Sequence, residues 1–222
     1  VCGALKEAHG VGLIHRDVKP ANIYLCRRGE IADFVKVLDF GLVRELNSDQ
    51  STSLSSADAV VGTPLYLSPE AILKPSQIDA RADLYGLGGV AYFLATGTTP
   101  FSGQNMVEIC GHHLHTAPEP PSRRQPVPED LERVILSCLA KDPTTRPQTA
   151  AALIGALEAC RDARTWSQGD AEAWWLATTT GREPPAAPEP SSSGEQPRMM
   201  VCRVDLERRL DELERYLDEL QG

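Results

Sequence analysis

The chain has 222 residues, of which 41% are hydrophobic and 24% charged, as expected for a globular chain with a substantial core. Its formal net charge of −9 argues against broad binding to the phosphate backbone of nucleic acid, which needs a cationic face. The longest apolar run, residues 84–95, is interrupted by glycines and is shorter than the roughly 18 residues that a membrane span needs, so no span is predicted.

The N-terminal residues carry no recognisable targeting signal. Residues 1–14 lack both the basic start and the cleavage site of a secretory signal peptide. The cysteines are scattered and none of them form a CxxC pair, so we expect reduced thiols in a cytoplasmic protein. The chain begins with Val1 rather than methionine, which we interpret as the mark of a piece of a longer protein.

Residues 1–160 are expected to form one compact unit that begins with a helix. Two short β-rich runs, 22–25 and 34–38, are separated by a glycine-containing turn and predict a β-hairpin. Later in the unit, apolar residues recur at helical spacing, as in 131–139 and 153–160. The expected order is therefore a helix, a hairpin, a long loop and then several helices.

Three motifs follow one another within this unit. They are His15-Arg16-Asp17-Val18-Lys19-Pro20-Ala21-Asn22, then Asp39-Phe40-Gly41 directly after the second run, and then the segment 62–70, GTPLYLSPE. In this order and with these gaps, they resemble the eukaryotic-type (Hanks-type) Ser/Thr protein kinases, especially the bacterial members. The resemblance covers only the C-terminal lobe. It implies an α+β fold, mainly α-helical with a small β-hairpin, followed by a linker and a C-terminal helix.

The resemblance also implies a reaction, the Mg²⁺-dependent transfer of the γ-phosphoryl group of ATP to Ser or Thr hydroxyls of protein substrates in signalling. Such transfer mainly needs positioning and charge neutralisation, and Mg²⁺ prefers oxygen ligands. Asn22 and Asp39 would hold the metal ion. Asp17 would receive or orient the substrate hydroxyl, and Lys19, typical of kinases acting on Ser/Thr, would steady the transferring phosphoryl charge. Tyr24 would form the floor of the adenine pocket.

Other residues match the family in supporting roles. Thr63 resembles the threonine that bridges the catalytic Asp and Lys, and Leu42 resembles the residue type that favours serine as the acceptor. Glu70 and Arg146 are expected to form an ion pair at the end of the activation segment. Asp83 resembles the helix aspartate that hydrogen-bonds the backbone of the catalytic loop.

The loop between Gly41 and Thr63 is rich in hydroxyl groups. The resemblance implies that Arg16 pairs with a phosphate on this loop, and the distance from Thr63 favours Ser55 and Ser56 as its sites. A phosphate would add about −2 of charge and order the loop against the arginine. The alternative is a polar loop whose serines are incidental.

The N-terminal lobe of a kinase is not recognisable in this sequence. A Gly-rich loop, a strand lysine and a helix glutamate are needed, and only Lys6 precedes the catalytic loop, in a helical pattern. Three interpretations remain: a fragment of a genuine kinase, a non-catalytic kinase-like scaffold or binding module, or a chain whose N-lobe comes from another polypeptide. We favour the fragment, because a scaffold has no physical need to keep Asp17, Asn22 and Asp39 together.

Two segments of the compact unit carry weaker signals. His112, His113 and His115 are interpreted as a surface turn of histidines rather than a metal site, because no fourth ligand is apparent. The proline-rich run from Pro118 to Pro128 is expected to be a loop between helices, with a role as a ligand for another domain as the alternative.

The remaining residues divide into three segments. Residues 161–180 are expected to form a Trp-rich helical extension that packs on the lobe, with Ser167 or Asp170 near its start, or else a patch that docks a partner. Residues 181–198 are a Pro/Ser-rich linker. Residues 199–222 place leucines at heptad spacing, which favours either a homodimer or docked coiled coil, or an amphipathic helix that folds back.

Overall fold

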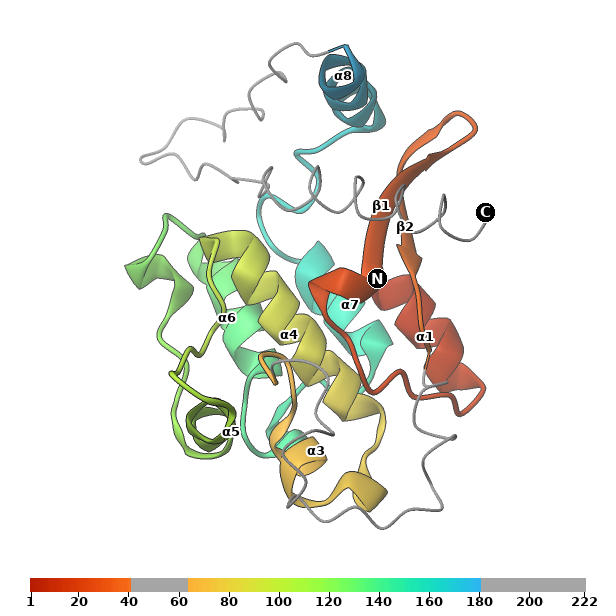
Figure 1. Cartoon of the computed structure of the whole chain (residues 1–222). Coiled ribbons are helices and arrows are strands. Elements are labelled where there is room, and N and C mark those ends of the chain that lie inside the picture. Colours follow the sequence, from red (N-terminus) through yellow and green to blue (C-terminus); the bar gives the residue numbers. More distant parts are fainter. Residues whose placement is uncertain (41–63, 181–222) are drawn as a thin grey trace, which may run out of the picture.

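The computed structural model describes residues 1–40 and 64–180 (Figure 1). Its helices are α1 (Cys2–Gly10), α3 (Pro69–Leu73), α4 (Ala80–Thr96), α5 (Met106–His115), α6 (Glu129–Cys138), α7 (Ala150–Glu158) and α8 (Gln168–Thr179). Short 3₁₀ turns are η1 (Pro20–Asn22), η2 (Pro75–Gln77), η3 (Pro121–Arg123) and η4 (Pro143–Thr145). Strands β1 (Ile23–Arg28) and β2 (Ile31–Val37) pair antiparallel. The mainly helical α+β fold with one hairpin is confirmed, and no helix in the described ranges is long and apolar enough to cross a bilayer.

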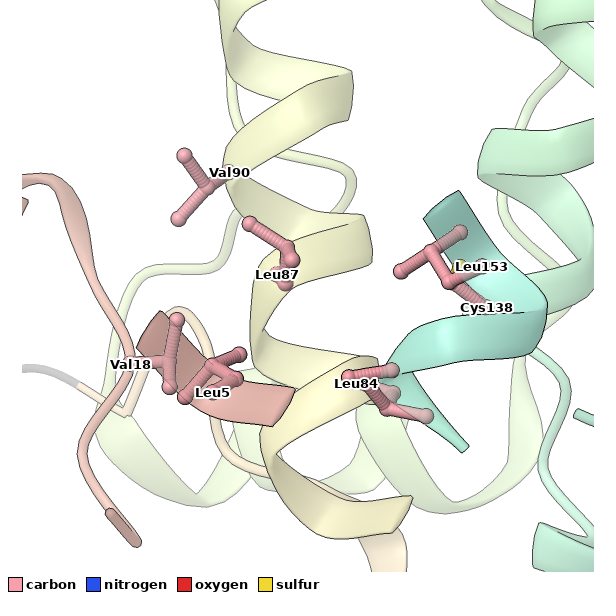
Figure 2. Packing of buried hydrophobic residues seen from close by; sticks show 8 residues of the cluster. Leu5, Val18, Leu84, Leu87, Val90, Cys138 and Leu153 are labelled. Atoms are coloured by element: carbon pink, nitrogen blue, oxygen red, sulfur yellow. The ribbon is translucent and has the colours of Figure 1, made fainter. Parts of the chain in front are cut away.

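Helix α4 is the centre of the fold. It begins at Asp79, whose carboxylate accepts a hydrogen bond from the backbone N–H of Arg81 at 2.9 Å, and it ends at Gly97, which takes the left-handed conformation that glycine adopts easily. Apolar residues lie on all sides of this helix, as expected for a helix that is buried all round. Figure 2 shows the resulting core, which combines Leu84, Leu87 and Val90 of α4 with Leu5, Val18, Cys138 and Leu153.

Glycines of α4 allow two neighbouring segments to approach the helix closely. A Cβ atom at Gly86 would lie 3.0 Å from the carbonyl oxygen of Val18, in residues 15–22, the predicted catalytic loop. A Cβ atom at Gly88 would lie 2.5 Å from Cβ of Cys138, in α6. The first glycine therefore sets how close the catalytic loop lies to α4, and the second sets the spacing between α4 and α6.

Replacing Gly88 by alanine is expected to lower the free energy of unfolding by about 2 kcal/mol, because the new methyl group overlaps the buried Cys138 side chain. Urea unfolding followed by circular dichroism measures this change. The matched control is Gly111→Ala in α5, where an added Cβ meets nothing within 4 Å and alanine should stabilise the helix by up to about 1 kcal/mol. Equal effects at the two positions would contradict the close packing of α4 on α6.

The expectation of a surface turn at the three histidines is wrong. His112, His113 and His115 lie in helix α5, and His113 is fully buried with its Nδ1 2.9 Å from the hydroxyl of Tyr85. Burial, helped by the nearby charge of Lys141, lowers the pKa of His113 to about 4, so its ring is neutral at pH 7. The period of α5 turns this histidine inward, so it serves as a core residue.

The predicted loop between helices agrees with the structure. The segment from Pro118 to Pro128 joins α5 to α6 and contains only the short turn η3. Helix α8 starts at Ser167, which forms a capping box with Asp170: the backbone N–H of Ser167 donates to the aspartate carboxylate at 2.8 Å, and that of Asp170 donates to Ser167 Oγ at 3.2 Å. Helix α8 then packs against β2 (Figure 1).

Candidate active site

The loop that begins at His15 is anchored on one buried carboxylate. Asp83, only 2% exposed in α4, accepts the backbone N–H of Arg16 on Oδ1 at 2.7 Å and that of His15 on Oδ2 at 2.8 Å. Arg16 takes a left-handed conformation, with φ of 69°. The turned backbone thereby directs two successive N–H groups at one anion, an arrangement that suits a carboxylate. The anchor holds the start of the catalytic loop against the central helix.

His9 is a further partner of this carboxylate, and sequence analysis missed it. Its Nε2 lies 2.8 Å from Asp83 Oδ2, although the two residues are 74 positions apart. His9 lies in the last turn of α1, directly before the segment that leads into the loop. No local sequence pattern identifies this contact, because a histidine at the end of a helix can equally well point into solvent.

His15 connects the catalytic loop to the segment that follows β2. Its Nδ1 accepts the backbone N–H of Asp17 at 3.3 Å, so Nε2 carries the proton and donates to the carbonyl of Leu38 at 2.8 Å. The buried imidazole also packs against the Phe40 ring, with 4.6 Å between centroids. Two of the sequence motifs are therefore joined through one histidine.

Asp17, Lys19 and Asn22 meet in the same loop. The side-chain amide of buried Asn22 donates to the backbone carbonyl of Asp17 at 2.8 Å and to its Oδ2 at 3.1 Å. The ammonium group of Lys19 lies 2.7 Å from the same Oδ2. The Asp17 side chain remains 55% exposed, so its carboxylate is held in place and still open to solvent.

The hairpin brings the end of β2 back to the start of β1. Ile23 pairs with Val37, and the backbone N–H of Leu38 donates to the carbonyl of Asn22 at 2.9 Å. Asp39 comes directly afterwards, exposed and with a left-handed φ of 59°. Aspartate tolerates this conformation better than most residues, and such backbone outliers cluster at functional sites.

The donor set at this point suits Mg²⁺. The amide nitrogen of Asn22 is used in its bonds to Asp17, which leaves its Oδ1 for a metal ion, and the exposed Asp39 carboxylate supplies a second oxygen. Mg²⁺ commonly takes one or two protein oxygens and completes its shell with phosphate and water. Within residues 1–40 and 64–180, no cluster of three His, Cys, Asp or Glu residues forms an all-protein metal site.

Glu70 and Arg146 form a bidentate ion pair away from the loop. The guanidinium donates to the two carboxylate oxygens at 2.6 and 2.8 Å, and its other N–H groups donate to the carbonyls of Ala140, Arg81 and Lys141. Burial by itself would raise the pKa of Glu70, but the hydrogen bonds and charge of Arg146 outweigh it, so that pKa is lowered. The pair fastens α3 to the loop before α7.

The remaining expected site residues divide by position. Tyr24 lies half-buried in β1, paired with Lys36 of β2. The residues that fall outside the described part of the chain are Leu42, Ser55, Ser56, Thr63 and those of the segments 181–198 and 199–222.

Comparison with known proteins agrees with this geometry. Residues 1–156 match the family model of the protein kinase domain. The Ser/Thr protein kinase Pkn3 of Myxococcus xanthus is 45% identical over 163 residues, which are 72% of this chain and 30% of that protein. PknB of Mycolicibacterium smegmatis, also a Ser/Thr protein kinase, is 46% identical over 151 residues, 68% of this chain and 23% of the relative. The chain thus spans less than a third of the length of these two relatives.

Solved structures agree at the level of the fold. The crystal structure of the Rad53 kinase domain and SCD2 in complex with AMPPNP superposes with a TM-score of 0.51 and 27% sequence identity. The match covers 70% of this chain and 54% of that one. The family model spans more than half of the chain and includes both the anchored catalytic loop and the paired strands, so the chain belongs to the protein kinase family.

Proposed function

We propose that this chain carries the C-terminal lobe of a bacterial Ser/Thr protein kinase, which transfers the γ-phosphoryl group of ATP to serine or threonine hydroxyls of protein substrates. The observation that supports this best is the double anchoring of the site. Asp83 holds the backbone at residues 15–16, and the hydrogen bond from Leu38 to Asn22 keeps the start of β1 beside Asp39. Motif order alone does not require either contact.

The proposed roles follow from which atoms are already engaged. Oδ2 of Asp17 is occupied by Lys19 and Asn22, so Oδ1 is the oxygen left to orient the acceptor hydroxyl and take its proton. Lys19, held beside it, would steady negative charge on the transferring group. Asn22 Oδ1 and Asp39 would hold Mg²⁺, which neutralises phosphate charge when bound. Tyr24, from the same hairpin, would lie under the adenine.

Exposed apolar residues near the site support a missing partner lobe. Leu13, just before the catalytic loop, is 45% exposed, and Leu38, just before Asp39, is 39% exposed. Apolar side chains beside a catalytic loop are costly to leave in water, and an N-terminal lobe would cover them. Such a lobe would be encoded upstream or supplied by another polypeptide, whereas a scaffold would have none.

The C-terminal residues extend the proposal. The heptad leucines of residues 199–222 favour a homodimer in which one copy phosphorylates the activation loop of the other, at Ser55 or Ser56 beside Arg16. Residues 181–198 would be the linker that allows this approach. A cytoplasmic location fits such a role.

The proposal predicts that the 222-residue chain incorporates almost no phosphate from Mg²⁺-ATP, whereas a chain extended with its upstream coding region phosphorylates itself. In the extended chain, Asp17→Asn should lower the rate roughly 10²- to 10⁴-fold, the usual contribution of a general base. Radiolabelled ATP measures both rates. The thermal midpoint of Asp17→Asn should stay near that of the wild type, because Asp17 is half exposed.

Two outcomes contradict the proposal. One is an extended chain with a Gly-rich loop and strand lysine that transfers no phosphate, which favours the scaffold or binding module. The other is full activity in Asp17→Asn, measured beside the control Asp162→Asn, which removes a carboxylate without a hydrogen-bonding partner within the described residues.

A further inference from the structure

Two tryptophans of the C-terminal extension hold one carboxylate of the hairpin. Trp166 donates its indole N–H to Asp33 Oδ2 at 2.8 Å, and Trp175 donates to Asp33 Oδ1 at 2.8 Å. The donors lie 133 and 142 positions from the aspartate in the sequence. Each indole has a single donor, and both are aimed at the same ion, so the arrangement is a specific contact.

The backbone around Asp33 is shaped for this contact. The regular pairing of β1 with β2 is interrupted between Cys26 and Arg28, and Asp33 lies opposite this irregularity with a left-handed φ of 56°. A β-bulge redirects the side chain that it carries. Asp33 is in this way turned toward Trp175 of α8, the helix that packs most extensively on the hairpin within the described residues.

An isolated two-stranded hairpin is at best marginally stable in water. Helix α8 packs on β2, and Ala32 of β2 and Ala171 of α8 are only 3% and 2% exposed, so the hairpin has buried apolar support. The Asp33 carboxylate, bound by two indole N–H groups, therefore attaches the hairpin to the extension that supports it.

The same hairpin connects this contact to the candidate site. From the bulge, an uninterrupted ladder pairs residues 23–26 with residues 34–37. Asn22 directly precedes the ladder on one strand, and Asp39 follows it closely on the other. A displacement of the hairpin at Asp33 is therefore carried by paired strands to both proposed metal ligands.

We propose that Asp33 is a positioning residue, which holds the hairpin against α8 through Trp166 and Trp175 and so fixes Asn22 and Asp39 for nucleotide binding. This role rests on the proposed kinase function. If Asp33 has this role, residues 161–180 contribute to nucleotide binding through the hairpin. Since both indole N–H groups are used inside the molecule, this role also differs from the alternative of a patch that docks a partner.

The first test is hydrogen exchange on the 222-residue chain, which requires no activity. Asp33→Gly is the main variant, because glycine accepts the left-handed backbone and so removes the carboxylate without adding strain. Amides of residues 23–26 and 34–37 should exchange about tenfold faster than in the wild type, while amides of α4 stay unchanged. Asp33→Asn keeps one acceptor oxygen, so its amide exchange rates should lie between those of the wild type and those of Asp33→Gly.

The matched control is Glu30→Gln, at an exposed acidic residue in the turn of the same hairpin. It should leave the exchange rates within twofold of the wild type, a difference well below that of a lost hydrogen bond. Unchanged exchange in Asp33→Gly would overturn the contact as a support of the hairpin.

The second test is steady-state kinetics on the upstream-extended chain. Asp33→Gly should raise KM for Mg²⁺-ATP about tenfold with a smaller change in kcat, because nucleotide binding is what the hairpin positions. Faster exchange with an unchanged KM would overturn the link to the site. A wild-type extended chain without any phosphoryl transfer would instead overturn the proposed function, and the positioning role with it, even where the exchange difference is found.

Discussion

Asp83→Asn is expected to lower the free energy of unfolding by roughly 3 kcal/mol, because an amide has one acceptor oxygen where the carboxylate has two. At 2% exposure, Asp83 accepts hydrogen bonds from two backbone N–H groups, those of His15 and Arg16, and from His9. The amide NH₂ of the variant would face at least one of these donors. A donor left unpaired inside the core cannot turn to water, so most of its desolvation cost remains.

Urea unfolding at pH 7 measures the loss, and Asp162→Asn is the control because it makes the same chemical change at a carboxylate without a hydrogen-bonding partner within residues 1–40 and 64–180. The control should stay within about 0.5 kcal/mol of the wild type. In the upstream-extended chain, Asp83→Asn should also abolish autophosphorylation, because the catalytic loop loses its anchor. A variant as stable as the wild type would show that the loop is held by other contacts.

Arg146→Ala is expected to lower the free energy of unfolding by roughly 3–5 kcal/mol, the usual effect of leaving one member of a buried ion pair without its partner. The Arg146 side chain is fully buried, while that of Glu70 is 16% exposed. The substitution also removes donors to three carbonyls and the packing of the guanidinium over the Tyr85 ring, 4.8 Å from its centroid. The exposed Arg164→Ala is the matched control and should be close to neutral.

The effect of this substitution should depend on pH in a defined direction. Arg146 outweighs the burial that raises the pKa of Glu70 and holds it below the ordinary value of 4.5, so the stabilisation is complete above pH 4.5 and is lost as pH falls through the lowered pKa. In Arg146→Ala the Glu70 carboxylate stays buried and keeps its hydrogen bonds to backbone and to Ser68, but it loses its cation, so protonation at low pH relieves the unpaired charge. The stability difference between wild type and variant should therefore be largest at neutral pH and shrink below pH 4.5.

Unfolding curves at several pH values, together with the double variant Glu70→Gln/Arg146→Ala, test this origin. The double variant should be less destabilised than Arg146→Ala alone, since no charge is left behind. A difference that stays constant from pH 7 to acid would show that packing on Tyr85, and not the ion pair, accounts for the loss.

Much of the site was predictable because its residues belong to compact motifs. The spacing from Asp17 to Asn22 is short enough for one loop, and Asp39 follows a strand that pairs with its neighbour in the hairpin. Glu70, Asp83 and Arg146 were identified through resemblance, since no local rule predicts contacts between residues that far apart. The helix at His113 and its burial were missed because a cluster of polar histidines suits an exposed turn as well as a helix, and only packing shows which face meets the core.

The sequence by itself determined the order of elements, the hairpin, a helix start near Ser167 or Asp170 and the kinase motifs, because each depends on interactions within a few neighbouring residues. Only the tertiary structure decided that His9 joins Asp83 and that Trp166 and Trp175 hold Asp33. These contacts connect residues 74 to 142 positions apart. They arise from how α1, α4 and α8 pack, a global outcome of core burial that no short stretch of sequence encodes.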